Sequence, residues 1–417
     1  MRTETVIVGA GQAGLSLSRY LAAARRPHVV LDRGRVGERW RSERWDSLTL
    51  LTPNWLNRLD GAPPHDDEHG FLGREAFVRY LERYAAHAPV REHVGVRRVE
   101  RERGDGFCVV TDAGTWHARN VVVATGDSAD PYVPSLAVTL EGPRQIHSVE
   151  YRNPVALRPG GVLIVGAGPT GQQLAAELRR TGRRVLLAVG AHGRMVRSYR
   201  GRDIWCWLKE LGDLDQRRED RPDDAARPRS LTVTGANGGE QLDLAVLHDL
   251  GVTLTGRLER FDGSVARFAD DLDANVADAE RRLDRVLDRI DAQFPDRPHK
   301  PDRPERVSLP EAPAAVDLAG AGMSTVIWAT GYRRRYPWLD VDVFDESGEI
   351  EQRDGVTPVP GLYVLGRNFQ SRRSSHFIGG VGRDAAAIAA LLLGRERSRV
   401  ADAARDPVRD VVAGADA

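Results

Sequence analysis

Two glycine-rich stretches of the same form constrain this chain more than any other feature of its sequence. Residues 6–14 read VIVGAGQAG, and residues 163–171 read LIVGAGPTG. In each stretch a short aliphatic run leads directly into the spacing GxGxxG. This spacing is typical of the turn between the first strand and the first helix of a dinucleotide-binding fold. The chain is therefore expected to contain two such folds.

The first glycine stretch has the complete pattern of a dinucleotide site. Its three glycines permit a tight turn, a close backbone approach to a pyrophosphate, and close packing of the helix on the strand. The N-terminus of the following helix would stabilise the phosphate charge. The next apolar run ends at Asp32, close to the ~20-residue spacing at which a carboxylate binds ribose. We therefore predict that FAD binds here, through Gly9, Gly11, Gly14 and Asp32.

The second glycine stretch differs from the first where its second strand ends. That strand, expected at residues 184–189, is followed by no acid and by four arginines, Arg194, Arg197, Arg200 and Arg202. A site without the acid and with an arginine suits a ribose that carries a 2′-phosphate. We therefore predict that NADPH, rather than NADH, binds through Gly166, Gly168, Gly171 and Arg194. The alternative is a solvated basic loop in an arginine-rich protein.

The order of the remaining strands predicts how the two folds are joined. The sequence ATG, which ends an aliphatic run at 124–126 and another at 329–331, lies downstream of each glycine stretch, and Gly126 would let the chain pass close to a cofactor. The fold class predicted is α/β, with two Rossmann-like dinucleotide-binding domains in a glutathione-reductase-like arrangement. The expected ranges are 1–150 and 319–395 for the FAD domain, 151–318 for an inserted NADPH domain, and 396–417 for a loosely ordered tail.

One helix and one linker are predicted within the second domain. Apolar residues recur at three- and four-residue spacing from 272 to 294, which predicts an amphipathic helix that faces a core. Six prolines between 295 and 313 then favour an extended, semi-rigid linker, or else an arm over the active site.

Charge and cysteine content exclude several classes of protein. The chain has 60 Lys+Arg and 60 Asp+Glu, so no net field would attract nucleic acid or an acidic membrane. The two cysteines, Cys108 and Cys206, form no CxxC pair, so neither a disulfide framework nor a metal site is expected. No apolar run approaches the ~20 residues that span a bilayer. We expect a cytoplasmic protein that binds neither nucleic acid nor membrane.

Several short motifs, taken in order, resemble those of one family. They are GAGQAG at 9–14, GERWR at 37–41, RWDSLTLLTPNW at 44–55, HSVEY at 147–151, GAGPTG at 166–171, YRGRDIWCWL at 199–208, ATGY at 329–332, and GLYVLG at 361–366 with FIGGVGRDA at 377–385. Their order and spacing over nearly the whole chain resemble the flavin-containing monooxygenases (class B flavoprotein monooxygenases). The resemblance is greatest to the short bacterial flavoproteins labelled CzcO-like.

The resemblance implies a reaction and places further residues beside the cofactors. It implies a bound FAD that NADPH reduces, and a C4a-(hydro)peroxyflavin that passes oxygen from O2 to a nitrogen, a sulfur or a carbonyl of a small organic substrate. It also implies that Arg39 and Trp40 lie along the flavin, and that Ile378 and Gly379 lie near its ring at the start of the last helix.

The chain departs from the family pattern at two places. Of the fingerprint FxGxxxHxxxY only His147 and Tyr151 remain, because Glu141 and Pro143 occupy the phenylalanine and glycine positions. Relatives place an asparagine before the dipeptide TP, where this chain has Leu51 and has an asparagine after the proline instead, Asn54. These departures favour, as an alternative, NADPH oxidation that releases hydrogen peroxide.

Two residues are the catalytic candidates, each with a structural alternative. Asn54 would lie beside the flavin or would cap the next turn, and His147 would act near NADPH or would be a strand-end histidine bonded to backbone. Trp205 and Trp207 would line a substrate pocket or, as their spacing favours, pack in the core.

Two other functions remain open from the sequence. One is an NADPH-dependent flavoprotein reductase that passes electrons to another protein, although the missing CxxC argues against disulfide reduction. The other is a protein that only senses a nucleotide. The expected partners are a small substrate and O2, and the sequence also allows a homodimer.

Overall fold

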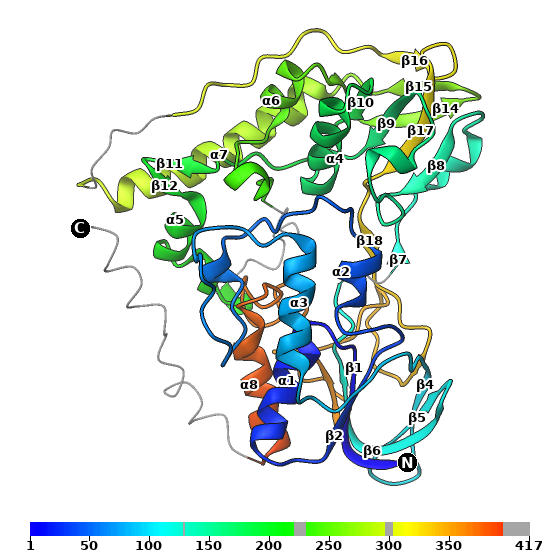
Figure 1. The fold of residues 1–417 in the computed structure, drawn as a ribbon, viewed down its shortest axis with the longest axis vertical. Helices are drawn as coiled ribbons and strands as arrows, with labels where there is room; N and C mark the ends of the chain where they lie inside the picture. Colours follow the sequence, from blue (N-terminus) through cyan, green and yellow to red (C-terminus); the bar gives the residue numbers. More distant parts are fainter. Residues whose placement is uncertain (128–129, 221–230, 297–302, 395–417) are drawn as a thin grey trace.

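Two α/β units make up the chain. The computed structural model describes residues 1–127, 130–220, 231–296 and 303–394. In Figure 1 the unit that carries the N-terminus lies below the unit that carries α4 and β9. The α/β fold class predicted from the sequence is confirmed. Within the described residues no helix is both long and apolar enough to cross a membrane.

The first unit is built on an eight-stranded sheet. Its strand order is β19-β4-β5-β6-β1-β2-β3, and β20 also pairs with β6. The strands are β1 (Arg2–Val8), β2 (His28–Leu31), β3 (Val90–Arg91), β4 (Val96–Arg101), β5 (Phe107–Thr111), β6 (Gly114–Val123), β19 (Leu339–Asp340) and β20 (Leu362–Val364). Strand β1 pairs in parallel with both β2 and β6, whereas β4, β5 and β6 form an antiparallel meander.

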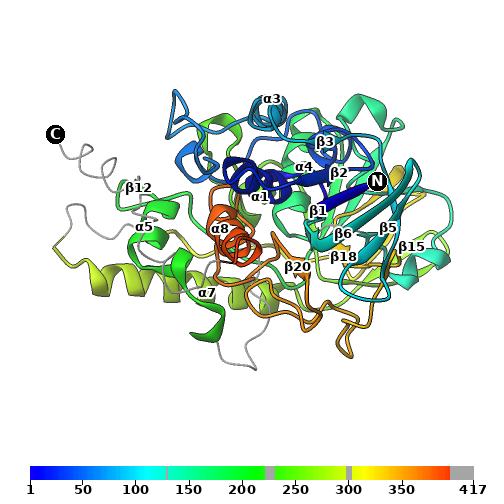
Figure 2. The same cartoon turned by 90° about the horizontal axis from the view of Figure 1, so that it is seen from below.

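Three helices cover one face of this sheet. They are α1 (Gln12–Ala23), α3 (Arg74–Ala85) and α8 (Val381–Leu392), and Figure 2 shows them on the same side of the strands. Leu15, Phe77 and Ile388, one from each helix, share a buried cluster with Ile7 of β1. Since α8 ends the described chain, the first unit is completed by residues from both ends of the sequence.

The second unit is built on a five-stranded parallel sheet in the order β13-β10-β9-β17-β8. The strands are β8 (Arg144–His147), β9 (Gly161–Val165), β10 (Val185–Ala188), β13 (Thr253–Thr255) and β17 (Met323–Trp328). Helices α4 (Pro169–Arg180), α6 (Leu244–Asp249) and the start of α7 (Leu272–Gln293) pack on one face. The small sheet β14 (Leu258–Asp262), β15 (Val265–Phe268) and β16 (Ala315–Asp317) packs on the other.

Strand pairing shifts the boundaries expected for the second unit. The expected range of 151–318 leaves out β8 and β17, yet β17 lies between β9 and β8 in the second sheet. The reason is physical: the aliphatic run at 325–328 would suit a central strand of either sheet, and its partners lie far away in sequence. By its strands, the second unit extends from 144 to 328.

Shorter elements connect the two units and complete the surface. They are α2 (Glu38–Ser42), α5 (Ile204–Glu210), and the two-residue strands β7 (Asp130–Pro131), β11 (Ser198–Tyr199), β12 (Arg202–Asp203) and β18 (Tyr332–Arg333). The antiparallel pair of β7 and β18 joins the segments that follow β6 and β17.

The predicted amphipathic helix and part of the predicted linker are seen. Helix α7 spans Leu272–Gln293 and buries Leu283, Leu287 and Ile290, so the predicted helix is confirmed. Residues 303–313 have neither helix nor strand. Val307 and Leu309 of this segment pack against the core of the second unit. The tail expected at 396–417 lies outside the described residues.

Candidate active site

The three glycines of the first loop serve three different steric purposes. Gly9 has φ +113°, and a Cβ there would lie 2.6 Å from the carbonyl oxygen of Ala124. A Cβ on Gly14 would lie 2.0 Å from the carbonyl oxygen of Gly9, so only glycine lets α1 pack this closely on the turn. A Cβ on Gly11 would have no neighbour within 4 Å. The middle glycine therefore leaves open space at the N-terminus of α1, as close approach of a pyrophosphate requires.

The second loop repeats this arrangement. Gly166 has φ +108°, and a Cβ there would lie 2.7 Å from the carbonyl oxygen of Ala329. A Cβ on Gly171 would lie 1.8 Å from the carbonyl oxygen of Gly166. Gly168 again faces open space at the N-terminus of α4. In both units the first glycine therefore lies against the strand that ends in ATG. The repeated open position fits a dinucleotide at each loop.

The two ATG turns also share one backbone geometry. Gly126 has φ +73° and Gly331 has φ +80°, and a Cβ at either position would meet open space.

The Asp32 carboxylate accepts hydrogen bonds from the backbone N–H groups of Ala10 (2.7 Å) and Gly34 (2.9 Å). A carboxylate has further lone pairs, so Asp32 is held beside the loop and can still accept from a ribose hydroxyl.

One cavity lies between the two glycine loops. It has a volume of about 340 Å³, and its wall includes Gln12 of the first loop and Pro169 and Thr170 of the second. Both loops follow the carboxyl ends of parallel strands, which is where ligands of such sheets bind. Groups bound at the two loops would therefore meet in this cavity.

Only some of the residues expected along the flavin lie on the wall of this cavity. Trp40 and Ile378 line the cavity, and the Trp40 ring also contacts Phe77 edge-on at 4.7 Å. Arg39 instead pairs with Glu43 at 3.5 Å, and burial lowers the pKa of its guanidinium. Gly379 packs against another part of the chain, because a Cβ there would lie 2.5 Å from the carbonyl oxygen of Leu56.

Asn54 lies outside this cavity and holds two loop segments together. Its Nδ2 donates to the carbonyl of Asp67 (2.8 Å), and its Oδ1 accepts from the N–H of Leu72 (2.9 Å). Both ends of the buried amide are therefore occupied, which matches neither the flavin-side role nor the cap predicted for it. Asn54 contributes to the wall of a separate, larger cavity of about 880 Å³. Leu51, by contrast, lines the cavity between the loops.

His147 has the geometry of the structural alternative. Its Nε2 bonds to the carbonyl of Gly331 (3.0 Å), and its Nδ1 accepts from the N–H of Val149 (3.3 Å). The ring also contacts Tyr332, which lines the cavity, with 5.4 Å between ring centres. Burial lowers the pKa of His147, which favours the neutral ring, and both ring nitrogens have partners. His147 therefore holds the second ATG turn in place and is not itself on the cavity wall.

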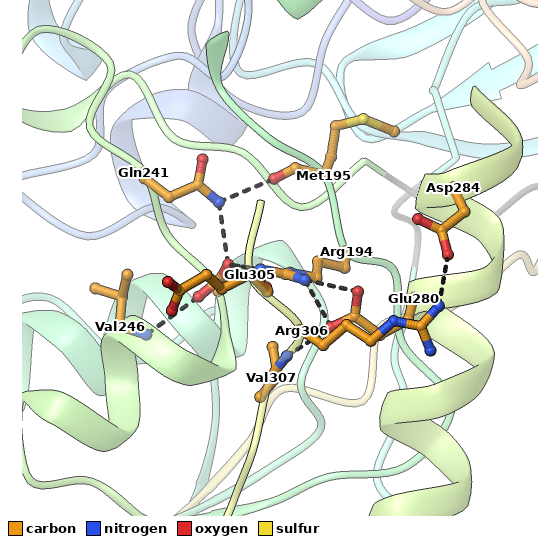
Figure 3. Close-up of polar contacts among 10 residues, drawn as sticks. Arg194, Met195, Gln241, Val246, Glu280, Asp284, Glu305, Arg306 and Val307 are labelled. Atoms are coloured by element: carbon orange, nitrogen blue, oxygen red, sulfur yellow. Dashed lines mark hydrogen bonds and ion pairs between the residues drawn. The ribbon is translucent and has the colours of Figure 1, made fainter. Parts of the chain in front are cut away.

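Arg194, predicted to bind the 2′-phosphate, lies in a buried ion network instead. Its guanidinium bonds Glu280 of α7 (2.6 Å) and the carbonyl of Glu305 (3.0 Å), as Figure 3 shows. It also donates to Asp243 at the start of α6 (3.1 Å). Nε and both terminal nitrogens are thus engaged, and the side chain is 7% exposed. The other arginines of this stretch also have carboxylate partners: Arg197 with Asp203, Arg200 with Asp291, and Arg202 with Glu210. The structure gives this basic stretch a stabilising role in the fold.

The two tryptophans of the motif at 199–208 have different roles: one lines the cavity and the other packs in the core. Trp205 lines the cavity and donates from Nε1 to the carbonyl of Leu51 (3.3 Å). Trp207 is fully buried and donates to the carbonyl of Tyr199 (2.7 Å). Burial raises the pKa of the Cys206 thiol between them, which disfavours the reactive thiolate.

Several polar residues on the cavity wall were not predicted from the sequence. Arg44 donates to the hydroxyl of Tyr332 (3.3 Å) and lies 5.6 Å from the centre of the Trp40 ring. His376 and Arg373 reach the wall from the loop before α8. Arg44 and Tyr332 stand inside motifs that were recognised, but no spacing rule singles out which motif residues face a cavity.

Comparisons with known proteins agree with this geometry. A family model described as pyridine nucleotide-disulphide oxidoreductase matches residues 6–209. An uncharacterized CzcO-like oxidoreductase of Geobacillus kaustophilus is 31% identical over 388 residues, which cover 92% of this chain and 96% of that protein. A probable indole-3-pyruvate monooxygenase of Arabidopsis thaliana is 30% identical over 182 residues, covering 42% of this chain and 44% of its own length.

A solved structure shares the fold over nearly the whole chain. The flavin-containing monooxygenase from Stenotrophomonas maltophilia superposes with a TM-score of 0.66 at 20% identity, covering 94% of this chain and 98% of that one. The long match at 31% identity, the two glycine loops and the shared two-unit fold all agree. The chain belongs to the CzcO-like oxidoreductases, and its fold is similar to that of a flavin-containing monooxygenase.

Proposed function

We propose that this enzyme is an FAD-dependent, NADPH-using monooxygenase that oxygenates a small organic substrate at nitrogen, sulfur or a carbonyl group. The observation that carries the proposal is the cavity of about 340 Å³ whose wall includes residues of both glycine loops. Through such a cavity a nicotinamide at one loop can reach a flavin ring at the other. Bound FAD would supply the redox chemistry, by accepting a hydride and then reacting with O2.

The residues of this chain would bind, orient and enclose the reacting groups. Gly11 and Gly168 leave open space for the two pyrophosphates at helix N-termini. Trp40, Leu51, Trp205 and Ile378 give the cavity an apolar and aromatic wall, which favours exclusion of water from the reacting centre. His147 fixes the Gly331 turn and thereby the position of Tyr332 on that wall.

The choice of nicotinamide needs a direct test. The four arginines that predicted NADPH all have carboxylate partners within the chain. Purified protein should therefore be titrated with NADPH and with NADH without oxygen, while the flavin absorbance is followed. Faster bleaching by NADPH supports the proposal, and equal or faster bleaching by NADH would replace NADPH by NADH in it.

Rapid mixing of the reduced protein with oxygenated buffer tests oxygen insertion. A transient absorbance that differs from both reduced and oxidised flavin, followed by formation of an oxygenated product from a panel of amines, sulfides and ketones, supports a monooxygenase. Direct return of oxidised flavin with stoichiometric hydrogen peroxide, in the presence of the same panel, would contradict it.

The second candidate is an NADPH oxidase or reductase without oxygen insertion. Leu51 lines the cavity at the position where the family resemblance implies an asparagine, and this favours the candidate. Disulfide reduction is disfavoured, because burial raises the pKa of both cysteine thiols and neither thiol lies on the cavity wall.

A further inference from the structure

A carboxylate, a thiol and an imidazole lie together on the antiparallel meander of the first unit. Cys108 of β5 is paired with His117 of β6 on one side and with Glu100 of β4 on the other. Directly opposite residues have their side chains on the same face of a sheet, and Glu102, two residues after Glu100, extends that face. Strand pairing therefore brings together three kinds of group that bind transition metals.

The possible ligand atoms of Glu102, Cys108 and His117 are close enough to share one ion. A carboxylate oxygen, the thiol sulfur and a ring nitrogen all lie within 4.8 Å of one another. The carboxylate of Glu102 already forms a hydrogen bond with Nδ1 of His117. In a tetrahedral zinc site, bonds of about 2.0–2.3 Å place the ligand atoms roughly 3.5 Å apart. Rotation of the three side chains would therefore suffice to complete such a site.

The cluster faces solvent, so an ion can reach it. The side chains of His117 and Glu102 are 42% and 36% exposed. The opposite face of the same strands is apolar, with Val99, Phe107 and Val109 fully buried. Figure 1 shows the meander beside the N-terminus, at the end of the first unit that lies away from the second unit. The cluster is therefore separate from the cavity between the loops.

A cation would stabilise the negative groups around Cys108. Burial and the carboxylates of Glu100 and Glu102 raise the pKa of the Cys108 thiol. Arg98 acts against them but is paired with Glu100, and Arg2 of β1 adds a second positive charge to this face. Both arginines are exposed, so solvent screens their charge. A divalent ion at the sulfur would displace the thiol proton and offset the charge of the carboxylates.

We propose that Glu102, Cys108 and His117 bind Zn²⁺, with the fourth position left to water. Zinc accepts thiolate, imidazole and carboxylate ligands in tetrahedral geometry, whereas Mg²⁺ and Ca²⁺ prefer sites made of oxygen atoms. Because its ligands lie on β5, on β6 and directly after β4, the ion would hold the meander together. The missing CxxC pair predicted no metal site, since this one is assembled by strand pairing and not by sequence spacing. The proposal does not depend on the proposed function.

The test uses Co²⁺ as a spectroscopic probe of the zinc site in the purified protein, with the thiols kept reduced. Tetrahedral Co²⁺ absorbs at longer wavelengths than flavin, so bound flavin does not interfere. The wild type should bind one Co²⁺ per chain, and Zn²⁺ should displace it and remove the absorbance. Zn²⁺ should also raise the urea midpoint, because an ion stabilises the state that binds it.

Single substitutions test which residues are the ligands. Cys108→Ser, Glu102→Gln and His117→Gln should each weaken Co²⁺ binding at least about 10-fold, the loss that follows removal of even a group that supports a ligand. Cys108→Ser keeps the contact between Glu102 and His117, so its urea midpoint should equal that of the wild type without Zn²⁺ and should not rise with it. Cys206→Ser changes the other cysteine of the chain and is the matched control, which should bind Co²⁺ like the wild type.

Two results would overturn the proposal. One is a wild type that gains no cobalt absorbance and is not stabilised by Zn²⁺, because Glu102 and His117 would then form only an ion pair. The other is unchanged Co²⁺ binding by Cys108→Ser, because the ion would then lie elsewhere on the protein. Neither result bears on hydride or oxygen transfer, which the anaerobic reduction and rapid-mixing experiments decide separately.

Discussion

At the scale of single residues, the middle and last glycines of one loop predict opposite defects. In Gly14→Ala the new Cβ would lie 2.0 Å from the carbonyl oxygen of Gly9, so the apoprotein should lose about 3 kcal/mol of stability. In Gly11→Ala the Cβ meets nothing within 4 Å, and apoprotein stability should change by less than about 1 kcal/mol. The methyl group would instead occupy the space left for the pyrophosphate, so FAD affinity should fall at least about 10-fold.

Urea unfolding of the apoproteins and a flavin-fluorescence titration measure the two effects. Gly168→Ala, in the second loop, is the matched control and should leave FAD affinity unchanged. Equal stability loss in Gly11→Ala and Gly14→Ala would show that the open space at Gly11 is not what the loop requires.

The lowered pKa of His147 predicts that the stability of the protein depends on pH. Its pKa in the folded protein lies below the ordinary value of 6.5, so at mildly acidic pH the unfolded chain binds a proton that the folded ring excludes. Its contribution is therefore complete above pH 6.5 and is lost as the pH falls from there towards the folded pKa. His147→Gln should reduce the dependence of unfolding free energy on pH between 7.5 and 5.5, by up to about 1.4 kcal/mol per pH unit.

Urea midpoints of the wild type and His147→Gln at pH 7.5, 6.5 and 5.5 check this expectation. The effect should run in one direction only, with the wild type losing its advantage as the pH falls. Parallel pH profiles of the two proteins would mean that His147 has the same pKa in the folded and the unfolded chain.

At the scale of elements, the Arg194 network connects the loop after β10 to α6 and α7. Asp243 and Glu280 are 6% and 8% exposed, so removal of the arginine would leave two buried carboxylates without their cation. Arg194→Met should therefore cost about 3–5 kcal/mol of stability. Arg257→Met, which breaks exposed pairs, is the control and should cost less than about 1 kcal/mol.

Coenzyme binding to Arg194→Met separates this role from the one predicted from sequence. The ratio of NADPH to NADH affinity should equal that of the wild type, because every nitrogen of the guanidinium is already engaged. If Arg194→Met kept the stability of the wild type but lost affinity for NADPH and not for NADH, Arg194 would contact the 2′-phosphate, as the sequence predicts.

What the sequence could predict depends on whether the information is local. The glycine loops and α7 could be predicted because spacing alone determines the turn and the helical face. The partners of Arg194 lie 49 and 86 residues away, and those of Asn54 lie on a different loop, so no local pattern could assign these side chains. The cavity wall was partly found, since Trp40 and Ile378 were expected there while His376 was not.

At the scale of the whole molecule, the strand order predicts which part of the chain can fold alone. A fragment of residues 151–318 lacks β8 and β17, so β9 would become an edge strand although Val162 and Ile164 are fully buried in the native sheet. An exposed apolar edge favours aggregation over folding. A fragment of residues 140–331 keeps all five strands, the glycine loop and the ATG turn.

Circular dichroism and urea unfolding of the two fragments test this division. Residues 140–331 should unfold in one cooperative transition, while residues 151–318 should show none. Addition of NADPH should raise the urea midpoint of the longer fragment, because a ligand stabilises the state that binds it by about 2.7 kcal/mol at 100 times its Kd. Cooperative unfolding of the shorter fragment would mean that β17 is dispensable to the second unit. The sequence-based boundaries, rather than the strand pairing, would then describe how this chain divides.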